Sequence, residues 1–325
     1  MVPRIAIARA AMLACVLTFS CALVHAQSYP TRPIQLMVPA AVGGSTDLFA
    51  RRVAQQLEKH LGQPIVVTNK GGGGGSIATG EVAKAKPDGY TLLMSTTGNA
   101  VINPLTMQLN FDPNKELTPI AVLGFVPFCI AINPALNATN VEQFIAVVKA
   151  SPGKYSYATN GPAGFIHMIT ELFSKQAGLD MVAVPYPGGT AMQQDLIAGR
   201  VPIYFDALNS ALRFHKTGQT RVIATTGGQR SVIAPDVPTV AESGLPGYVA
   251  ETAFILMTPT GTPATIIDRL AVASQKAMAD ETFRKDLEEM AIRPVSDSNP
   301  RAAAEYIRTE FEKWTPVVKG MKATN

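Results

Sequence analysis

Cysteine, histidine and charged residues are all scarce in this chain. Its 325 residues include three cysteines and four histidines, and Asp, Glu, Lys and Arg together make up only 16% of it. Cys15 and Cys21 lie in the apolar N-terminal stretch, so that Cys129 is the only cysteine in the rest of the chain. A single thiol excludes an internal disulfide scaffold, and the apolar surroundings of Cys129 (GFVPFCIAIN) predict a buried small side chain.

The sequence motifs of several enzyme classes are missing as well. Residues 43–47 (GGSTD) lack the second glycine of a G-x-S-x-G nucleophile turn. His60, His167 and His215 are too scattered for an H-E-x-x-H zinc motif, and no C-x-x-C occurs. We therefore expect no catalytic residue, no metal ion and no cofactor.

Clusters of positive charge are absent too. The formal net charge is +4, and Arg4 and Arg9 near the N-terminus account for two of those charges. Nucleic-acid-binding proteins carry grouped Lys and Arg side chains, and this chain has no such block. A nucleic-acid partner is therefore not expected.

The N-terminal residues have the pattern of a secretory signal peptide. Two arginines precede the apolar run Ala10–Val24, and small residues stand at Val24 and Ala26, the −3 and −1 positions of a cleavage site. The run is about 15 residues long, shorter than the ~20 that a spanning helix needs. We expect residues 1–26 to be the signal peptide and the mature chain to lie in the periplasm; an uncleaved anchor is the alternative.

After this stretch, short apolar runs alternate with amphipathic runs, the pattern of an α/β protein. The apolar runs predict strands at 34–38, 65–68, 90–95, 155–158, 181–184, 201–205, 221–225 and 251–258. The amphipathic runs predict helices at 48–61, 77–86, 141–149, 166–177, 190–198 and 210–215. The C-terminal part is almost wholly helical, with helices expected from Thr262-Pro263 to 279, at 281–290 after an Asp280 cap, and from Pro300 onward.

Two apolar segments, near 128–133 and 251–258, are candidates for paired connections between two lobes. The first lobe would then comprise 27–130 plus 251–325, and the second would comprise 131–250. The helical tail would lie on the first lobe, because it has no sheet of its own. One stripe of the last helix, formed by Ile307, Phe311, Trp314 and Val318, predicts packing against the core.

A run of five glycines, residues 71–75, follows the second predicted strand. Its position between a strand and a helix fits a dinucleotide-binding loop. However, the next strand ends without the acidic residue that would hold a ribose, and no Gly-Lys-Ser/Thr ends the run. A flexible turn that shapes the rim of a pocket is the favoured interpretation.

Four turns that follow predicted strands combine glycine with Ser, Thr or Asn and carry few charges: 43–47, 96–99, 159–164 and 187–190. In an open parallel sheet such turns gather at the carboxyl ends of the strands, where ligands bind. Each exposes backbone N–H groups at the positive end of a helix dipole. Each turn alone is explained by helix capping, but four of them without a catalytic residue favour reversible binding of a carboxylate.

Segments along the whole mature chain resemble the Bug (TctC-like) extracytoplasmic receptors of tripartite tricarboxylate transport systems. In order, they are YPTRPIQLMVP with GGSTD, LGQPIVVTNKGGGGGS, KPDGYTLLM, FIHMITELF, MVAVPYPGG, YFDALNSAL, APDVPTVAESGLPGY and TPTGTP. The resemblance implies a type II periplasmic-binding-protein fold, in which two α/β lobes joined by a two-crossing hinge close over a small organic acid. It also implies membrane transporter subunits as partners, and we expect the receptor to be a monomer.

The resemblance also implies which residues bind the ligand. The turns matching 43–47 and 159–165 would grip a carboxylate through amides, hydroxyls and water, and Asp206 of the YFD segment would face the cleft. His167 matches a helix-start histidine of the family, and we expect it to be structural. The candidate ligand-binding residues are Val42, Gly43, Gly44, Ser45, Thr46, Asp47, Thr97, Thr159, Asn160, Ala163, Gly164, Phe165, Gly188 and Asp206.

Two departures from the family pattern bear on the ligand. Ala40-Ala41-Val42 stands where the family has an aromatic residue and two prolines, and Ala163-Gly164-Phe165 stands where it has glycine and a Ser/Thr pair. These changes predict a ligand with an apolar body, such as an aromatic mono- or dicarboxylate, rather than citrate.

The sequence thus predicts a periplasmic binding protein that delivers a small carboxylate to a tripartite tricarboxylate-type transporter, and not an enzyme. Two alternatives stay open. One is a ligand-dependent sensor that docks on a receptor kinase. The other is a secreted enzyme acting on a carboxylated substrate, against which the missing nucleophile, base and metal ligands count.

Overall fold

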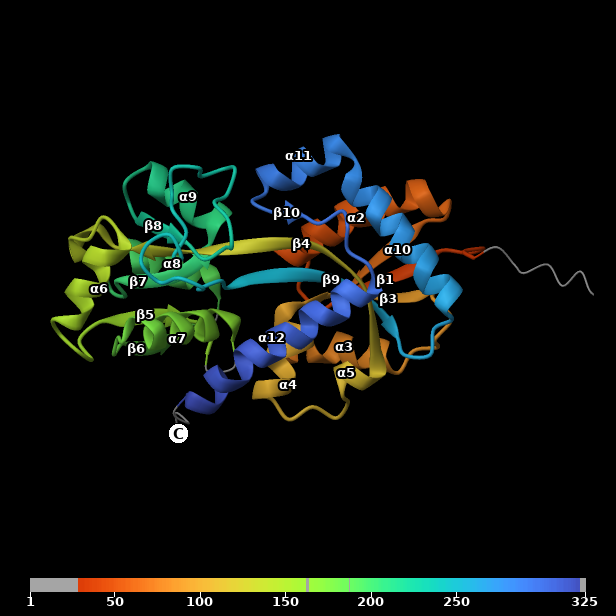
Figure 1. The fold of residues 1–325 in the computed structure, drawn as a ribbon, viewed down its shortest axis with the longest axis horizontal. Coiled ribbons are helices and arrows are strands. Elements are labelled where there is room, and N and C mark those ends of the chain that lie inside the picture. The colour runs from red at the N-terminus through yellow and green to blue at the C-terminus, as the bar shows by residue number, and fades with distance from the viewer. Residues whose placement is uncertain (1–28, 162–163, 187, 322–325) are drawn as a thin grey trace, which may run out of the picture.

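Residues 29–161, 164–186 and 188–321 are described in a computed structural model (Figure 1). The predicted signal peptide and Ala163 lie outside these residues. Within them, no helix has both the length and the apolar character that crossing a membrane requires.

The N-terminal strands build the first part of the sheet. β1 (Ile34–Val38) lies between β2 (Ile65–Asn69) and β3 (Thr91–Thr96) and is parallel to both. Between β1 and β2 runs α2 (Ser45–Leu61), and its apolar residues at helical spacing are buried. Gly62 ends α2 as predicted, in a left-handed conformation (φ 73°) in which its N–H bonds the Glu58 carbonyl.

Short helices connect the next elements. They are η2 (Gly73–Gly75), α3 (Ser76–Ala83), η3 (Gly98–Ile102), α4 (Asn103–Thr106) and α5 (Pro113–Glu116).

One long strand joins the two lobes. β4 (Leu117–Ile132) pairs along its first part with β9 (Glu251–Pro259), which in turn pairs with β3. From Phe128 onward β4 pairs instead with β7 (Ile203–Ala207) and, at its other edge, with β8 (Arg221–Thr225). The two strands β4 and β9 therefore run side by side at the centre of the molecule, between the lobes (Figure 1).

The second lobe repeats the α/β alternation. Its remaining elements are η4 (Pro134–Leu136), α6 (Val141–Lys149), β5 (Ser156–Thr159), α7 (Phe165–Ala177), β6 (Val182–Pro185), α8 (Gly189–Ile197) and α9 (Leu208–Lys216). The strand order along the sheet is β2-β1-β3-β9-β4-β7-β5-β6. β5 is parallel to β6 and β7, so that the carboxyl ends of these strands lie at one edge of the lobe. Cys129 is fully buried in this sheet, as predicted.

The C-terminal elements are α10 (Ala264–Ala279), α11 (Glu281–Glu289), β10 (Arg293–Pro294) and α12 (Pro300–Gly320). Asp280 caps α11 as predicted, and its carboxylate accepts a hydrogen bond of 2.8 Å from Phe283 N–H. The predicted Thr262 cap of α10 is wrong. The N-cap residue is Pro263, and the Thr262 hydroxyl donates to the Pro259 carbonyl instead.

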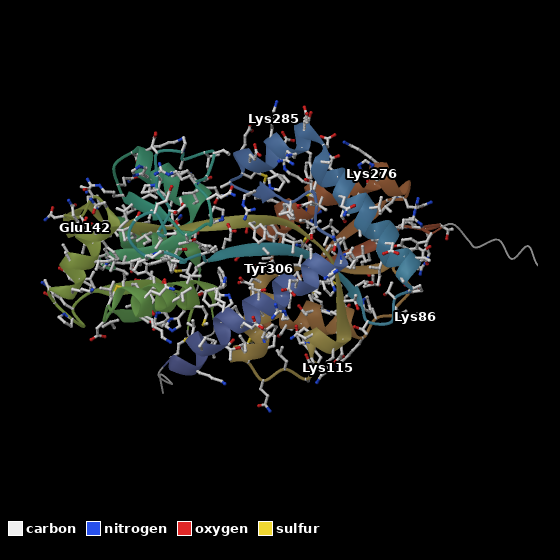
Figure 2. All side chains as sticks on the ribbon, in the orientation of Figure 1. Lys86, Lys115, Glu142, Lys276, Lys285 and Tyr306 are labelled. Atoms are coloured by element: carbon white, nitrogen blue, oxygen red, sulfur yellow. The ribbon has the colours of Figure 1, made fainter. Side chains whose placement is uncertain are left out.

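α12 lies against the first lobe, and its last turns reach α7 of the second lobe (Figure 1). The predicted apolar stripe is confirmed, since Trp314 is fully buried and Ile307 nearly so. Figure 2 shows Tyr306 at the centre of the molecule, where α12 packs against Phe125 of β4.

Candidate functional site

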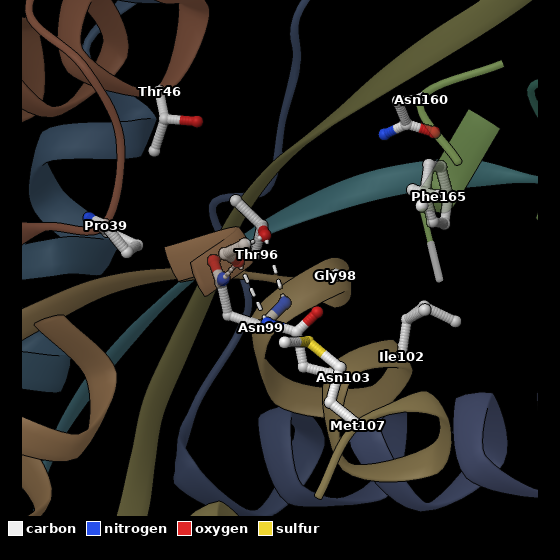
Figure 3. Close-up of a pocket in the computed structure, with 12 residues that line it drawn as sticks. Pro39, Thr46, Thr96, Gly98, Asn99, Ile102, Asn103, Met107, Asn160 and Phe165 are labelled. Carbon is white, nitrogen blue, oxygen red and sulfur yellow. Dashed lines mark hydrogen bonds between the residues drawn. The ribbon is translucent and has the colours of Figure 1, made fainter. Parts of the chain in front are cut away.

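A cavity of about 410 Å³ lies at the carboxyl ends of β1, β3 and β5. Residues of both lobes line it: Pro39, Thr46, Gly74, Thr96, Gly98, Asn99, Ile102, Asn103, Met107, Asn160, Gly164 and Phe165. In Figure 3, Pro39 and Thr46 face Asn160 and Phe165 across the cavity, while Asn103 and Met107 lie below. None of these lining residues is charged.

Two helices begin at this cavity, one from each lobe. Gly44 is the N-cap of α2 and Gly164 is the N-cap of α7, and in neither case does a side chain cap the helix. The first N–H groups of an uncapped helix carry a partial positive charge and are open to an external acceptor. Because Thr46 and Gly164 both line the cavity, the two helix ends favour an anion between them.

The predicted residue Asp47 does not face the cavity. Its carboxylate accepts hydrogen bonds from Gly43 N–H (2.8 Å) and Asn69 Nδ2 (2.9 Å), and it forms an ion pair with Arg51 at 2.9 Å. Burial acts to raise the pKa of Asp47, but the bonds from Gly43, Arg51 and Asn69 outweigh it and hold that pKa below its usual value. In this arrangement Asp47 shapes the turn that precedes α2 and does not line the cavity, and its contact with a ligand stays a prediction.

The apolar segment before the glycines is also arranged differently from the expectation. Val42 is 73% exposed, and Gly43, Gly44 and Ser45 are exposed without lining the cavity. The apolar contribution from this segment comes from the buried Pro39. The apolar lining predicted for the site is present, but Ile102, Met107 and Phe165 provide the rest of it.

Three further predicted residues lie off the cavity. Thr97 is fully buried, and its hydroxyl bonds Tyr306 Oη and accepts a hydrogen bond from Ala253 N–H, both at 2.8 Å. The Thr97 hydroxyl is thus paired within the protein, and the expected contact of Thr97 with a ligand stays a prediction. Gly188 is the N-cap of α8 and does not line the cavity.

Asp206, at the end of β7, is the third of these residues. It is nearly fully buried, and its carboxylate accepts hydrogen bonds from Gln193 Nε2 (2.9 Å) and Ala207 N–H (2.7 Å). Burial raises the pKa of Asp206 to about 6, although these hydrogen bonds act to lower it. The Asp206 carboxylate thus has its hydrogen-bond partners within the second lobe.

The turn after β5 contributes Asn160, Gly164 and Phe165 to the cavity, and their contact with a ligand stays a prediction. Thr159 is buried, and its hydroxyl has no partner within the part of the chain that the structure describes. The ring of Phe165 packs against those of Phe128 and Trp314, with centroid separations of 5.4 and 5.8 Å.

His167 is structural, as expected. Its Nδ1 lies 2.8 Å from Tyr157 Oη, and the Tyr157 hydroxyl donates to Glu171 at 2.7 Å. Burial lowers the pKa of His167, while the nearby Glu171 acts to raise it. A neutral imidazole that donates from Nδ1 satisfies this chain of bonds.

Residues 49–322 match the family described as "Tripartite tricarboxylate transporter family receptor" (TctC). The chain belongs to this family. As a member of the TctC family, it is a periplasmic solute-binding receptor. Its α/β fold is that of solved periplasmic binding proteins.

Relatives with known names are similar over nearly the whole chain. Protein BugT of Bordetella pertussis is 35% identical over 302 residues, which cover 91% of each chain. Two solved structures, both from Rhodopseudomonas palustris, show the same fold. Rpa4515 with adipate has 32% identity and a TM-score of 0.79, covering 90% of this chain and 97% of that one. MatC with bound malate has 29% identity and a TM-score of 0.76, covering 89% and 100%.

The part of the receptor's cavity that the sequence did not predict is formed by Ile102, Asn103 and Met107, next to the predicted turn 96–99. The Asn99 and Asn103 side chains both donate to the Gly74 carbonyl, at 2.8 and 2.9 Å, and Thr96 Oγ1 donates to Asn99 Oδ1 (Figure 3). The glycine run predicted to shape a pocket rim does so, because Gly74 lines the cavity. Residues Gly72 to Gly75 all have positive φ, between 56° and 111°, which explains why glycine is needed there.

Proposed function

We propose that this receptor captures a small organic carboxylate with an apolar body and delivers it to a tripartite tricarboxylate-type membrane transporter. The observation that carries this proposal is the cavity between two uncapped helix N-termini, whose lining has no charged residue and includes apolar side chains from both lobes. The helix ends suit a carboxylate, and Phe165, Ile102, Met107 and Pro39 suit hydrocarbon.

The magnitudes are compatible with a reversible carrier. A hydrogen bond to a charged group contributes roughly 1.5–3 kcal/mol. Four or five of these, with burial of an apolar body, reach the ~8 kcal/mol of micromolar affinity after the cost of association is subtracted. No arginine is required for such a site, which leaves the ligand free to dissociate toward a transporter.

The ligands of relatives support a dicarboxylate. Rpa4515 was solved with adipate and MatC with malate. Adipate carries two carboxylates on a hydrocarbon chain, the combination of polar ends and apolar middle that this cavity offers. We propose linear or aromatic dicarboxylates of this kind, adipate and phthalate among them, as the preferred ligands, and the periplasm as the location of the receptor.

We further propose that the lobes divide within β4 near Pro127 and Phe128 and at the start of β9, close to the boundaries expected at 130 and 250. The pairing of β4 changes from β9 to β7 at this point. Closure about these two strands would bring the exposed Gly43, Gly44 and Ser45, with Asn160 and the Thr159 hydroxyl, onto a bound carboxylate.

A thermal-shift screen of the purified receptor against aliphatic and aromatic acids tests this function. A ligand present at 100 times its Kd adds about 2.7 kcal/mol to the free energy of unfolding. We expect a rise in Tm with adipate and phthalate and a smaller one with citrate. No shift with any acid, or conversion of a bound acid to product, would overturn the proposal.

A further inference from the structure

The single tryptophan of the chain lies one contact away from the ligand cavity. Trp314 of α12 is fully buried, and its ring meets that of Phe165 edge to face at 5.8 Å. Phe165 lines the cavity as the first residue of α7. Trp314 itself does not line the cavity, and its ring contact with Phe165 connects it to the ligand site.

Polar contacts hold the Trp314 ring in place. Its Nε1 donates to Glu310 Oε2 at 2.7 Å, and Glu310 is 6% exposed. Glu310 also pairs with Lys313, whose ammonium donates to the Val249 carbonyl at 3.3 Å. Val249 precedes β9, one of the two strands between the lobes. The indole ring is thus held by packing and by its hydrogen bond to Glu310. The pair of Glu310 with Lys313 connects this bond to Val249, just before β9.

The same helix supports the opposite wall of the cavity. Two turns before Trp314, Tyr306 bonds Thr97 at 2.8 Å and packs edge to face against Phe125 at 5.5 Å. Thr97 directly precedes Gly98 and Asn99, which line the cavity in the first lobe. α12 therefore contacts residues behind both walls of the site, although it contributes no lining residue.

We propose that Trp314 is a positioning residue of the ligand site, which holds the Phe165 ring as the apolar wall against the body of the ligand. This inference rests on the proposed function. The aromatic neighbours of Phe165 are Phe128 and Trp314 in the part of the chain that the structure describes. Replacing the indole with a smaller side chain leaves a void behind Phe165, and the ring can then turn out of the cavity.

The test compares Trp314→Leu and Trp314→Phe with the wild type by calorimetric titration with adipate. We expect the Kd of Trp314→Leu to rise about fivefold to tenfold, the contribution of one aromatic pair. Trp314→Phe keeps a ring against Phe165, so its Kd should return to within about threefold of the wild type. The control is Phe144→Leu, which removes an equally buried ring of α6 that packs against Phe173 in the far part of the second lobe.

A general loss of stability would affect both leucine variants alike. The inference is supported if Trp314→Leu weakens binding while Phe144→Leu, at a matched drop in Tm, does not. It is overturned if the two variants bind adipate equally well. Fluorescence gives a second readout, because saturating adipate should change the emission of the only tryptophan, and an unchanged emission spectrum counts against the inference.

If the wild type binds no acid, the proposed function fails. Amide hydrogen exchange of the ligand-free protein then tests on its own whether Trp314 holds Phe165 in place. We then expect faster exchange in the first turn of α7 for Trp314→Leu but not for Phe144→Leu. Equal exchange in the two variants would overturn it.

Discussion

The carboxylate of Asp47 accepts a hydrogen bond of 2.8 Å from the backbone N–H of Gly43, four residues earlier. The side chain closes the turn between β1 and α2, and its second oxygen faces Asn69 and Arg51. This acid therefore sets the shape of the turn that precedes α2. Its negative charge is paired with Arg51 and accepts bonds from two neutral donors, away from the residues that line the cavity.

Loss of the Asp47 charge is expected to destabilise the fold at neutral pH. Asp47→Asn removes the ion pair with Arg51 and weakens the bond from Gly43, and we expect a loss of about 1–3 kcal/mol. Since the pKa of Asp47 is lowered in the fold, its contribution is present above the unfolded pKa and is lost as the pH falls through the folded value. The Tm difference from the wild type should shrink below pH ~4.

Asp286→Asn is the control for this charge effect. Asp286 forms an exposed pair with Arg52 at 3.6 Å, and such pairs contribute about 0–1 kcal/mol. A Tm difference for Asp47→Asn as small as that of Asp286→Asn at pH 7 would contradict the role assigned to Asp47.

Thr46 is expected to affect binding but not stability. It lies half-buried on the first turn of α2 and lines the cavity. Removing a hydroxyl that bonds a carboxylate should raise the Kd for adipate by about tenfold, while the Tm of the ligand-free protein stays within ~1 °C. Calorimetric titration checks this, with Thr265→Ala on the exposed start of α10 as the control. An unchanged Kd would remove Thr46 from the site.

Gly75 is expected to tolerate no side chain. Its φ is +90°, and a Cβ there would lie 2.3 Å from Asn99 Nδ2 and 3.0 Å from Pro39, both of which line the cavity. Gly75→Ala should lose about 2–4 kcal/mol of stability and weaken ligand binding. At Gly218 φ is +74° and nothing lies within 4 Å, so that Gly218→Ala isolates the backbone strain, about 1–2 kcal/mol. Equal Tm losses in the two variants would show that the Asn99 contact is unimportant.

Asp206 is expected to give the opposite pH dependence from Asp47. Because burial raises its pKa to about 6, the fold favours the protonated acid, and that stability is lost as the pH rises through the folded pKa. Between pH 4 and 7 the wild type should lose about 2 kcal/mol relative to Asp206→Asn, which carries no such charge. Thermal melts of both proteins across this range measure the effect. Parallel Tm curves would mean that Asp206 titrates near its ordinary value.

Much of the fold was predictable because local patterns decide it. The strand at 34–38 and the helix at 141–149 form within the predicted bounds, and Gly62 ends α2. The first half of β4 was missed, since Pro119, Gly124 and Pro127 interrupt its apolar run. The strand continues through them because its pairing with β9 shifts register at Pro119 and again before Gly124.

The site was predictable only in part, for a different reason. The turns that supply Thr46, Asn160 and Phe165 have a local signature, and the structure brings these residues to one cavity. The partner of Thr97 is Tyr306, 209 residues later. Asn103 and Met107 begin and follow a short helix, α4, that has no sequence pattern of its own. Contacts over such separations depend on how the lobes and α12 pack, which local spacing does not encode.

The most direct test of the whole account is calorimetric titration of the purified receptor with adipate, phthalate and citrate under one set of conditions. We expect saturable one-to-one binding of adipate or phthalate, with a Kd near micromolar, and citrate binding at least tenfold weaker. Saturation with citrate and no measurable binding of adipate or phthalate would contradict it.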